Sequence, residues 1–318
     1  MKKIFNSLII IISIIFIFYM CLYNPNIINN TIKSSINLFL NNIFPSLFIS
    51  LILSSLLIDL SIPEFLGNIF GKIFYKLFKV KKEGSFVFFM SILTGCPTNA
   101  KYINDLINKN IINNKEALKL LIISSFTNPF FIINTVGFLF LNNIKYGYII
   151  VLSLLLTNIT LGILFKNIYI SNKDKNINII SLVKKLNNNI NNTNILDSLF
   201  KSFISSVKIL VNVFYIITLS LLIINILNLN ANTIINAAFS GLIEITTGLK
   251  NIKNLNITSD IKLLLSTIII SFGGFSIHLQ IFNILNKKEV NYFYFLLSKI
   301  ISIPISIFYL YILKFILL

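Results

Sequence analysis

The sequence predicts an all-α protein, a polytopic bundle of transmembrane helices. Of its 318 residues, 56% are hydrophobic and 12% are charged, and an average soluble domain has about twice that charged fraction. Apolar runs of about 18–25 residues recur along the chain, and a helix of this length crosses the hydrocarbon core of a bilayer. The runs are continuously apolar, whereas the strands of a membrane β-barrel alternate between apolar and polar residues.

The net charge of +17 comes from lysines, since the chain contains no arginine. Most lysines lie in short connections between apolar segments, which membrane topology explains better than nucleic-acid binding does. The chain has one histidine and two cysteines, and its sequence contains no recognisable nucleophile–base pair, metal-ligand cluster or phosphate-binding loop. We therefore expect no enzyme activity, no catalytic residue, no metal or other cofactor, and no nucleic-acid partner.

Residues 1–30 begin with MKK and continue as an apolar run to about Tyr23, without the small residues of a signal-peptidase site. We interpret them as an uncleaved first transmembrane helix that starts in the cytoplasm. A second span is expected over roughly 36–60. Residues 68–82 then carry lysines at helical spacing among Ile, Phe and Leu, which predicts a helix on anionic lipid of the inner leaflet. Its basic residues are Lys72, Lys76, Lys79, Lys81 and Lys82.

Two broken segments and a plain span complete the first half of the chain, residues 31–170. The apolar segment 85–108 is interrupted by TGCPTNAK, and the segment 117–142 has Thr-Asn-Pro at its centre. A plain span follows at about 146–165. The next stretch, 171–196, is polar and rich in Asn and Lys, and we predict that it is a cytoplasmic linker.

The second half, residues 197–318, repeats this order. It has a long span at 199–227, an interrupted segment at 236–250, a broken span at 261–285 and a plain span at 292–317. From a cytoplasmic start, the long span runs inward in the first half and outward in the second. The halves are therefore predicted to be two inverted repeats with broken or re-entrant helices, a plan that many secondary transporters share.

The breaks predict a central binding site. An unpaired backbone group is costly in hydrocarbon, so helix breaks survive where protein or a water-filled cavity surrounds them. Gly95 permits a sharp turn and Pro97 cannot donate a backbone hydrogen bond, so a half-helix can begin near Thr98 with free N–H groups. We expect Thr98 and Asn99 to meet a ligand. Lys101 either faces the site or extends to the cytoplasmic interface.

The next two breaks supply further ligand candidates. Thr127 and Asn128 offer hydrogen-bond donors and acceptors beside a proline. Glu244 is the acidic residue inside an apolar stretch of the second half. An intramembrane carboxylate indicates a proton carrier or a cation ligand. The alternative is that its segment is interfacial and hydrated.

The last break contains a pair of glycines followed by polar residues. Gly273 and Gly274 allow a close approach of the backbone, and His278 and Gln280 follow on the same segment. His278 is either a packed, hydrogen-bonded side chain or a functional one, in which case a proton-linked pair with Glu244 is one arrangement. All four residues are candidates for ligand binding.

Five stretches form a set: FPSLF (44–48), GCPTNAK (95–101), SFTNPFFI (125–132), EITTG (244–248) and FGGFSIHLQ (272–280). Together they resemble the sporulation integral membrane protein family typified by YlbJ. That family belongs to the wider group with nucleoside-recognition or "Gate" domains and is related to the spore maturation proteins. Cys96 departs from the family pattern, in which a bulky aromatic residue is common.

The resemblance implies a role in endospore formation, in the mother-cell or forespore membrane. It implies no particular solute, because the nucleoside label rests on similarity to nucleoside transporters. The leading hypothesis is a transporter or permease-like protein that moves a small polar solute through a midplane site. The alternative is a non-transporting scaffold for spore cortex or coat assembly. The expected partners are the lipid bilayer, the solute and anionic lipid at 68–82. The sequence leaves open whether the chain forms a homo-oligomer.

Overall fold

The computed structural model describes the chain in five stretches and one isolated residue. Within this part of the chain every regular element is helical, which confirms the predicted all-α class. Most of the predicted first span and nearly all of the linker at 171–196 lie outside the described residues. Those described are Tyr19 and residues 22–60, 62–169, 195–229, 233–285 and 290–317.

The first described elements form one long helical run that ends in a sharp turn. Helix α2 (Pro25–Leu38) continues through a π-helical turn, η1 (Phe39–Ile43), into α3 (Phe44–Asp59). The axis then bends by 84° into α4 (Ile62–Phe78). The helical run that contains the predicted second span thus begins earlier than residue 36, because Pro25 starts the helix at a position where its missing N–H costs nothing.

The predicted breaks of the first half divide it into short helices. The segment 85–108 folds as two helices joined at Gly-Cys-Pro, and the segment 117–142 as a helix and a π-helix separated by an irregular stretch. The elements are α5 (Gly84–Thr94), α6 (Thr98–Asn108), α7 (Asn114–Ile123), η2 (Phe131–Phe140), α8 (Ile144–Leu164) and η3 (Phe165–Asn167).

The second half shows the same kind of division. Helices α11 and α12 are separated at Glu244, and α13 and α14 at Gly273, while the first and last helices are long. The elements are α10 (Ile195–Ile226), α11 (Ile234–Ile243), α12 (Ile245–Asn254), α13 (Ser259–Phe272), α14 (Gly274–Leu285) and α15 (Tyr292–Leu317).

Among the described residues, four helical segments are long and apolar enough to cross a membrane, and the bent α3–α4 pair could add a fifth. A chain with several such helices is compatible with a multi-pass membrane protein. The four segments are Ile144–Asn167, Leu196–Ile226, Ser259–Leu285 and Tyr292–Leu317.

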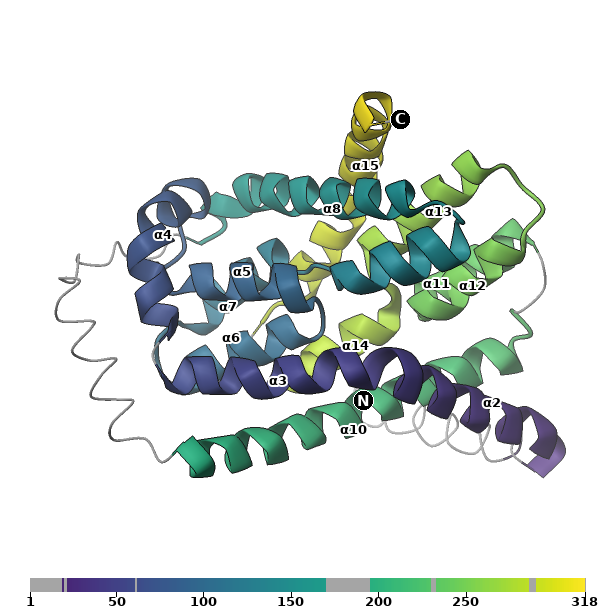
Figure 1. Cartoon of the computed structure of the whole chain (residues 1–318), viewed down its shortest axis with the longest axis horizontal. Coiled ribbons are helices and arrows are strands. Elements are labelled where there is room, and N and C mark those ends of the chain that lie inside the picture. The colour runs from purple at the N-terminus through teal and green to yellow at the C-terminus, as the bar shows by residue number, and fades with distance from the viewer. Residues whose placement is uncertain are drawn as a thin grey trace, which may run out of the picture.

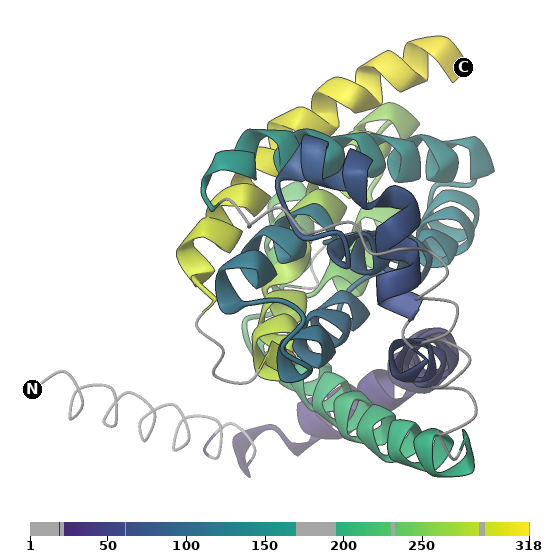
Figure 2. The ribbon, with the colours of Figure 1, turned by 90° about the vertical axis from the view of Figure 1, so that its left-hand side faces the viewer.

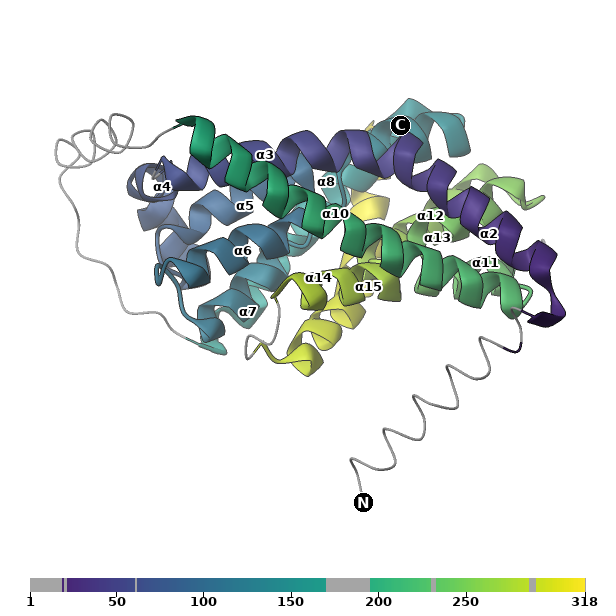
Figure 3. The ribbon, with the colours of Figure 1, turned by 90° about the horizontal axis from the view of Figure 1, so that it is seen from below.

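The long helices α3 and α10 pack against each other along one side of the molecule (Figures 1 and 3). They run in opposite directions and share an apolar cluster of their own, and Asn225 at the end of α10 donates to the hydroxyl of Thr31 in α2 at 2.5 Å. The short helices lie above them, and α15 crosses the top of the molecule (Figure 2). The cluster consists of Leu47, Leu51, Leu210, Val213, Ile217 and Leu221.

Candidate functional site: a cavity between four helix breaks

The tip between α5 and α6 is joined to the break after α7. The N–H of Cys96 donates to the carbonyl of Phe126 at 2.7 Å, and the amide of Asn128 donates to the carbonyl of Thr94 at 3.3 Å. Gly95 has φ 77° and ψ −169°, a conformation that essentially only glycine adopts. A Cβ at this position would lie 2.4 Å from the backbone nitrogen of Asn128, so the contact needs a glycine.

The break after α7 is organised by its own asparagine. The Oδ1 atom of Asn128 accepts from the N–H groups of Phe130 at 2.9 Å and Phe131 at 3.3 Å, and so caps the helical turn that leads into η2. Pro129 has no N–H to satisfy at this point. Both polar atoms of the Asn128 side chain are therefore used in hydrogen bonds within the fold. The hydroxyl of Thr127, in contrast, has no hydrogen bond within the described chain.

The second tip, between α11 and α12, is a tight helical hairpin with Glu244 at its turn. One carboxylate oxygen, Oε2, accepts from the N–H of Thr247 at 2.7 Å and from its hydroxyl at 3.0 Å, so Glu244 is the N-cap of α12. A Cβ on Gly248 would lie 2.2 Å from the Cα of Gly241 on the opposite helix. The two backbones can approach this closely only because both residues lack side chains.

The fourth break joins the second hairpin to α14. Gly273 ends α13 with a left-handed φ of 90°, and α14 begins at the next residue. A Cβ on Gly274 would lie 3.1 Å from the side chain of Ile245 and 3.3 Å from the carbonyl oxygen of Gly241. In each half of the chain, therefore, a hairpin tip packs against the break that follows it.

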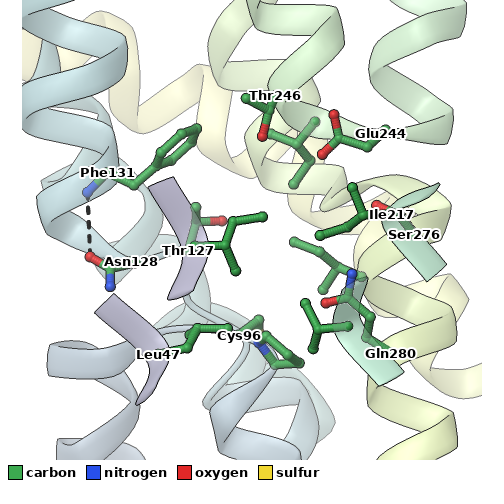
Figure 4. A pocket seen from close by; sticks show the side chains of 15 residues that line it. Leu47, Cys96, Thr127, Asn128, Phe131, Ile217, Glu244, Thr246, Ser276 and Gln280 are labelled. Carbon is green, nitrogen blue, oxygen red and sulfur yellow. Dashed lines mark hydrogen bonds between the residues drawn. The ribbon is translucent and has the colours of Figure 1, made fainter. Parts of the chain in front are cut away.

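Side chains from all four breaks surround one cavity (Figure 4). It leaves about 90 Å³ in which the centre of a water molecule fits. Helices α3 and α10 contribute an aliphatic wall, and the breaks contribute the polar groups. The lining consists of Ile43, Leu47, Cys96, Pro97, Thr127, Asn128, Phe131, Val213, Ile217, Glu244, Ile245, Thr246, Ser276, Ile277 and Gln280.

Several polar groups of the lining lack a hydrogen-bond partner within the described residues. Glu244 and Gln280 are each 4% exposed, and Ser276 is 1% exposed. The Oε1 atom of Glu244, the amide of Gln280 and the hydroxyls of Ser276, Thr127 and Thr246 receive or donate no hydrogen bond in this part of the chain. Buried polar groups are normally paired, so the cavity has the chemistry of a site for water or a polar solute.

Five of the twelve residues predicted to bind ligand line the cavity, and seven lie behind it. Thr98 and Asn99, which we expected to meet a ligand, are fully buried. The hydroxyl of Thr98 pairs with that of Thr94 at 2.7 Å, and the amide of Asn99 donates to the carbonyl of Ser124 at 3.3 Å. The lining residues are Pro97, Thr127, Asn128, Glu244 and Gln280; those behind are Gly95, Thr98, Asn99, Lys101, Gly273, Gly274 and His278.

Neither Lys101 nor His278 reaches the cavity. Lys101 is 3% exposed and its Nζ lies 3.0 Å from a carboxylate oxygen of Asp105 on the same helix. His278 lies 3.0 Å from the carbonyl of Phe272 through Nε2 and 3.2 Å from the hydroxyl of Tyr292 through Nδ1. The histidine thus belongs to a packed aromatic cluster, while Glu244 faces the cavity.

Sequence reasoning did not single out three polar residues of the lining, Cys96, Thr246 and Ser276. A signal was present for two of them. Ser276 precedes Gln280 by four residues and so shares its helix face, and Thr246 follows Glu244 at the same hairpin tip. A buried lysine, Lys299 of α15, was also missed; its Nζ donates to the carbonyl of Ser125 behind the lining at 3.2 Å.

A scan against protein-family models finds no match, and searches of curated proteins and of solved structures find none either. The resemblance to the sporulation family therefore stays a prediction from the five motifs. What the geometry itself establishes is a cavity between four helix breaks, with polar groups directed into it.

Proposed function

We propose that this chain is a multi-pass membrane protein that moves a small polar solute through the central cavity. One observation carries the proposal: groups from all four breaks line a single cavity, and five of its polar side chains have at least one polar atom without a hydrogen-bond partner in the described chain. Broken helices whose irregular backbone lines a polar cavity are typical of secondary transporters.

We further propose that the chain consists of two inverted repeats. The order of hairpin, broken segment and plain helix occurs twice among the described elements, as α5–α8 and as α11–α15. The helices that precede each hairpin, α3 and α10, run in opposite directions in Figures 1 and 3. Both features are expected of repeats related by an axis in the membrane plane.

The motif resemblance supports endospore formation as the process, and the mother-cell or forespore membrane as the location.

The test is to replace the gene in its spore-forming host by genes that encode the Glu244→Gln or Gln280→Leu variants. We expect both variants to reach the membrane at normal levels and to lose most heat-resistant spores, because each removes a polar group of the cavity. Asp197→Asn, an exposed position outside the cavity, is the control. Normal spore counts from both cavity variants would contradict the proposal.

A scaffold for cortex or coat assembly is the competing function, and the exposed lysines of α4 are the feature that favours it. Lys72 and Lys76 are exposed, whereas Lys79 donates to Asn167 at 2.8 Å and Lys81 to the carbonyl of Ile111 at 3.0 Å. If the chain acts as a scaffold, neutralising Lys72 and Lys76 should reduce sporulation more than either cavity substitution does.

A further inference from the structure

We infer that the solute of the cavity is a small organic cation, a protonated amine with an apolar part, whose charge is balanced by Glu244. The inference rests on the proposed function and adds the chemical class of the solute. It follows from the charge of the lining, from the free polar atoms and from the size of the space.

Among the described residues, the lining contains one carboxylate and no lysine or histidine. Glu244 is 4% exposed, and only one of its oxygens, Oε2, is held by Thr247. The N-terminus of α12 offsets part of the charge, since a helix end carries about half a unit charge. Lys299, the buried lysine nearby, has its Nζ on the carbonyl of Ser125 and lies outside the lining. Oε1 therefore presents a carboxylate oxygen to the cavity whose negative charge is only partly offset.

The free polar atoms suit an ammonium group. A primary ammonium has three donors and no acceptor. Oε1 of Glu244 can accept one of them, and the hydroxyls of Ser276, Thr127 and Thr246 and the carbonyl of the Gln280 amide can accept the others. These side chains surround the same space in Figure 4. A charge-assisted hydrogen bond to a carboxylate is stronger than one between neutral groups, so an ammonium gains more here than an alcohol does.

The rest of the lining suits a short apolar chain. Leu47 of α3, Ile217 of α10 and Ile277 of α14 are aliphatic, and the ring of Phe131 also borders the space. The available 90 Å³ corresponds to roughly six to nine water-sized positions. A ring face attracts a cation placed over it. The expected solute is therefore an amine of only a few non-hydrogen atoms.

Cys96 provides a reporter because it lines the cavity. The full-length protein carrying Cys21→Ser, so that Cys96 is its single cysteine, is placed in lipid nanodiscs and treated with methyl methanethiosulfonate. The rate of modification is measured with n-propylammonium chloride, propan-1-ol or NaCl at matched ionic strength. We expect n-propylammonium to slow modification by about threefold or more above its Kd, because a bound solute covers the thiol. Propan-1-ol and NaCl should have little effect.

Glu244→Gln should abolish this protection, whereas the exposed Asp197→Asn should retain it. Glutamine keeps an oxygen that can cap α12, so the variant retains this contact. The comparison of amine with alcohol uses the protein with its cavity unsubstituted and therefore does not depend on the folding of any cavity variant. Equal protection by propan-1-ol would overturn the cationic class while leaving a solute cavity in place. Protection by NaCl in the absence of the amine would overturn the organic class of the solute and would indicate an inorganic cation instead. Modification rates that are the same with all three solutes would overturn this inference, whereas normal spore counts from both cavity variants would overturn the proposed function.

Discussion

Lys119 is a buried lysine that holds three separate backbone carbonyls. It is 2% exposed, and its Nζ donates to the carbonyls of Lys79 at 2.9 Å, Lys166 at 2.9 Å and Tyr169 at 2.7 Å. The first two lie just beyond the end of α4 and within η3. One ammonium therefore satisfies three carbonyl acceptors, two of them at helix ends, where the last carbonyls have no intrahelical partner.

Replacing this lysine should destabilise the protein without touching the cavity. For Lys119→Met we expect a loss of about 2–4 kcal/mol in the free energy of unfolding, since charge-assisted bonds are lost and buried carbonyls are left unpaired. The measurement is thermal unfolding of the purified protein in detergent. Lys115→Met on the same helix is the control, because Lys115 is exposed. Equal melting temperatures for the two variants would contradict the stabilising role of Lys119.

Alanine substitutions at Gly95 and Gly273 distinguish the cost of backbone strain from the cost of a steric clash. Both have positive φ, but a Cβ on Gly95 would meet the backbone of Asn128 at 2.4 Å, whereas a Cβ on Gly273 would have only the His278 ring within 4 Å, at 3.9 Å. We expect Gly273→Ala to cost about 1–2 kcal/mol from its φ alone, and Gly95→Ala to cost more. Gly95→Ala should also change the reactivity of Cys96 toward thiol reagents. A smaller melting-temperature loss for Gly95→Ala than for Gly273→Ala would refute this reading.

Among the helical elements, the α11–α12 hairpin depends most directly on a glycine pair. Gly248→Ala would place a methyl group 2.2 Å from the Cα of Gly241, and neither backbone can move aside easily. We expect the two helices to separate, with faster amide hydrogen exchange over 234–254. Lys250→Ala, at an exposed position of α12, should leave exchange unchanged. Identical exchange in the two variants would show that the hairpin tolerates the added carbon.

Helix α4 presents Lys72 and Lys76 on the same outer face as Ile69 and Ile73, all four exposed. This face fits the interface of an anionic leaflet, where each lysine contributes about 1 kcal/mol. Replacing both lysines by Gln should lower the preference for phosphatidylglycerol over phosphatidylcholine by about 30-fold, since about 2 kcal/mol is lost. Native mass spectrometry of the protein with mixed lipids measures that preference. An unchanged preference for phosphatidylglycerol would show that these lysines of α4 do not bind anionic lipid.

At the scale of the whole molecule, inverted repeats require the two hairpins to open toward opposite sides of the membrane. The last residues of α6 and α12, Asn108 and Asn254, are both exposed. In a variant without Cys21 and Cys96, single cysteines at these positions should react with an impermeant maleimide from opposite sides of sealed vesicles. Labelling of both from the same side would exclude the inverted arrangement.

The positions of the helices and their breaks could be predicted because they depend on local composition. The last span was expected at 292–317 and is Tyr292–Leu317 in the structure, since a long apolar run has no other stable form in a membrane. Gly95, Pro129 and Gly273 likewise interrupt their helices at the predicted places, because glycine and proline act on the backbone wherever they stand.

Which side chains face the cavity could not be read from the same pattern. Each residue of a helix turns the side chain by about 100°, so a shift of one or two positions at a break exchanges lining residues for buried ones. Cys96 lines the cavity while Thr98, two residues later, is buried in bonds to its own hairpin. That outcome depends on the bond between Cys96 and Phe126 across two segments.

The order of residues thus specifies a helical protein with apolar segments long enough to cross a membrane and with four interruptions. The length of apolar runs and the backbone limits of Gly and Pro are properties of short segments. The site is a property of packing. Leu47 and Val213 form one wall although more than half the chain separates them, and Glu244 turns a free oxygen inward because Thr247 holds the other. Such contacts arise only when distant helices pack together, which no local pattern encodes.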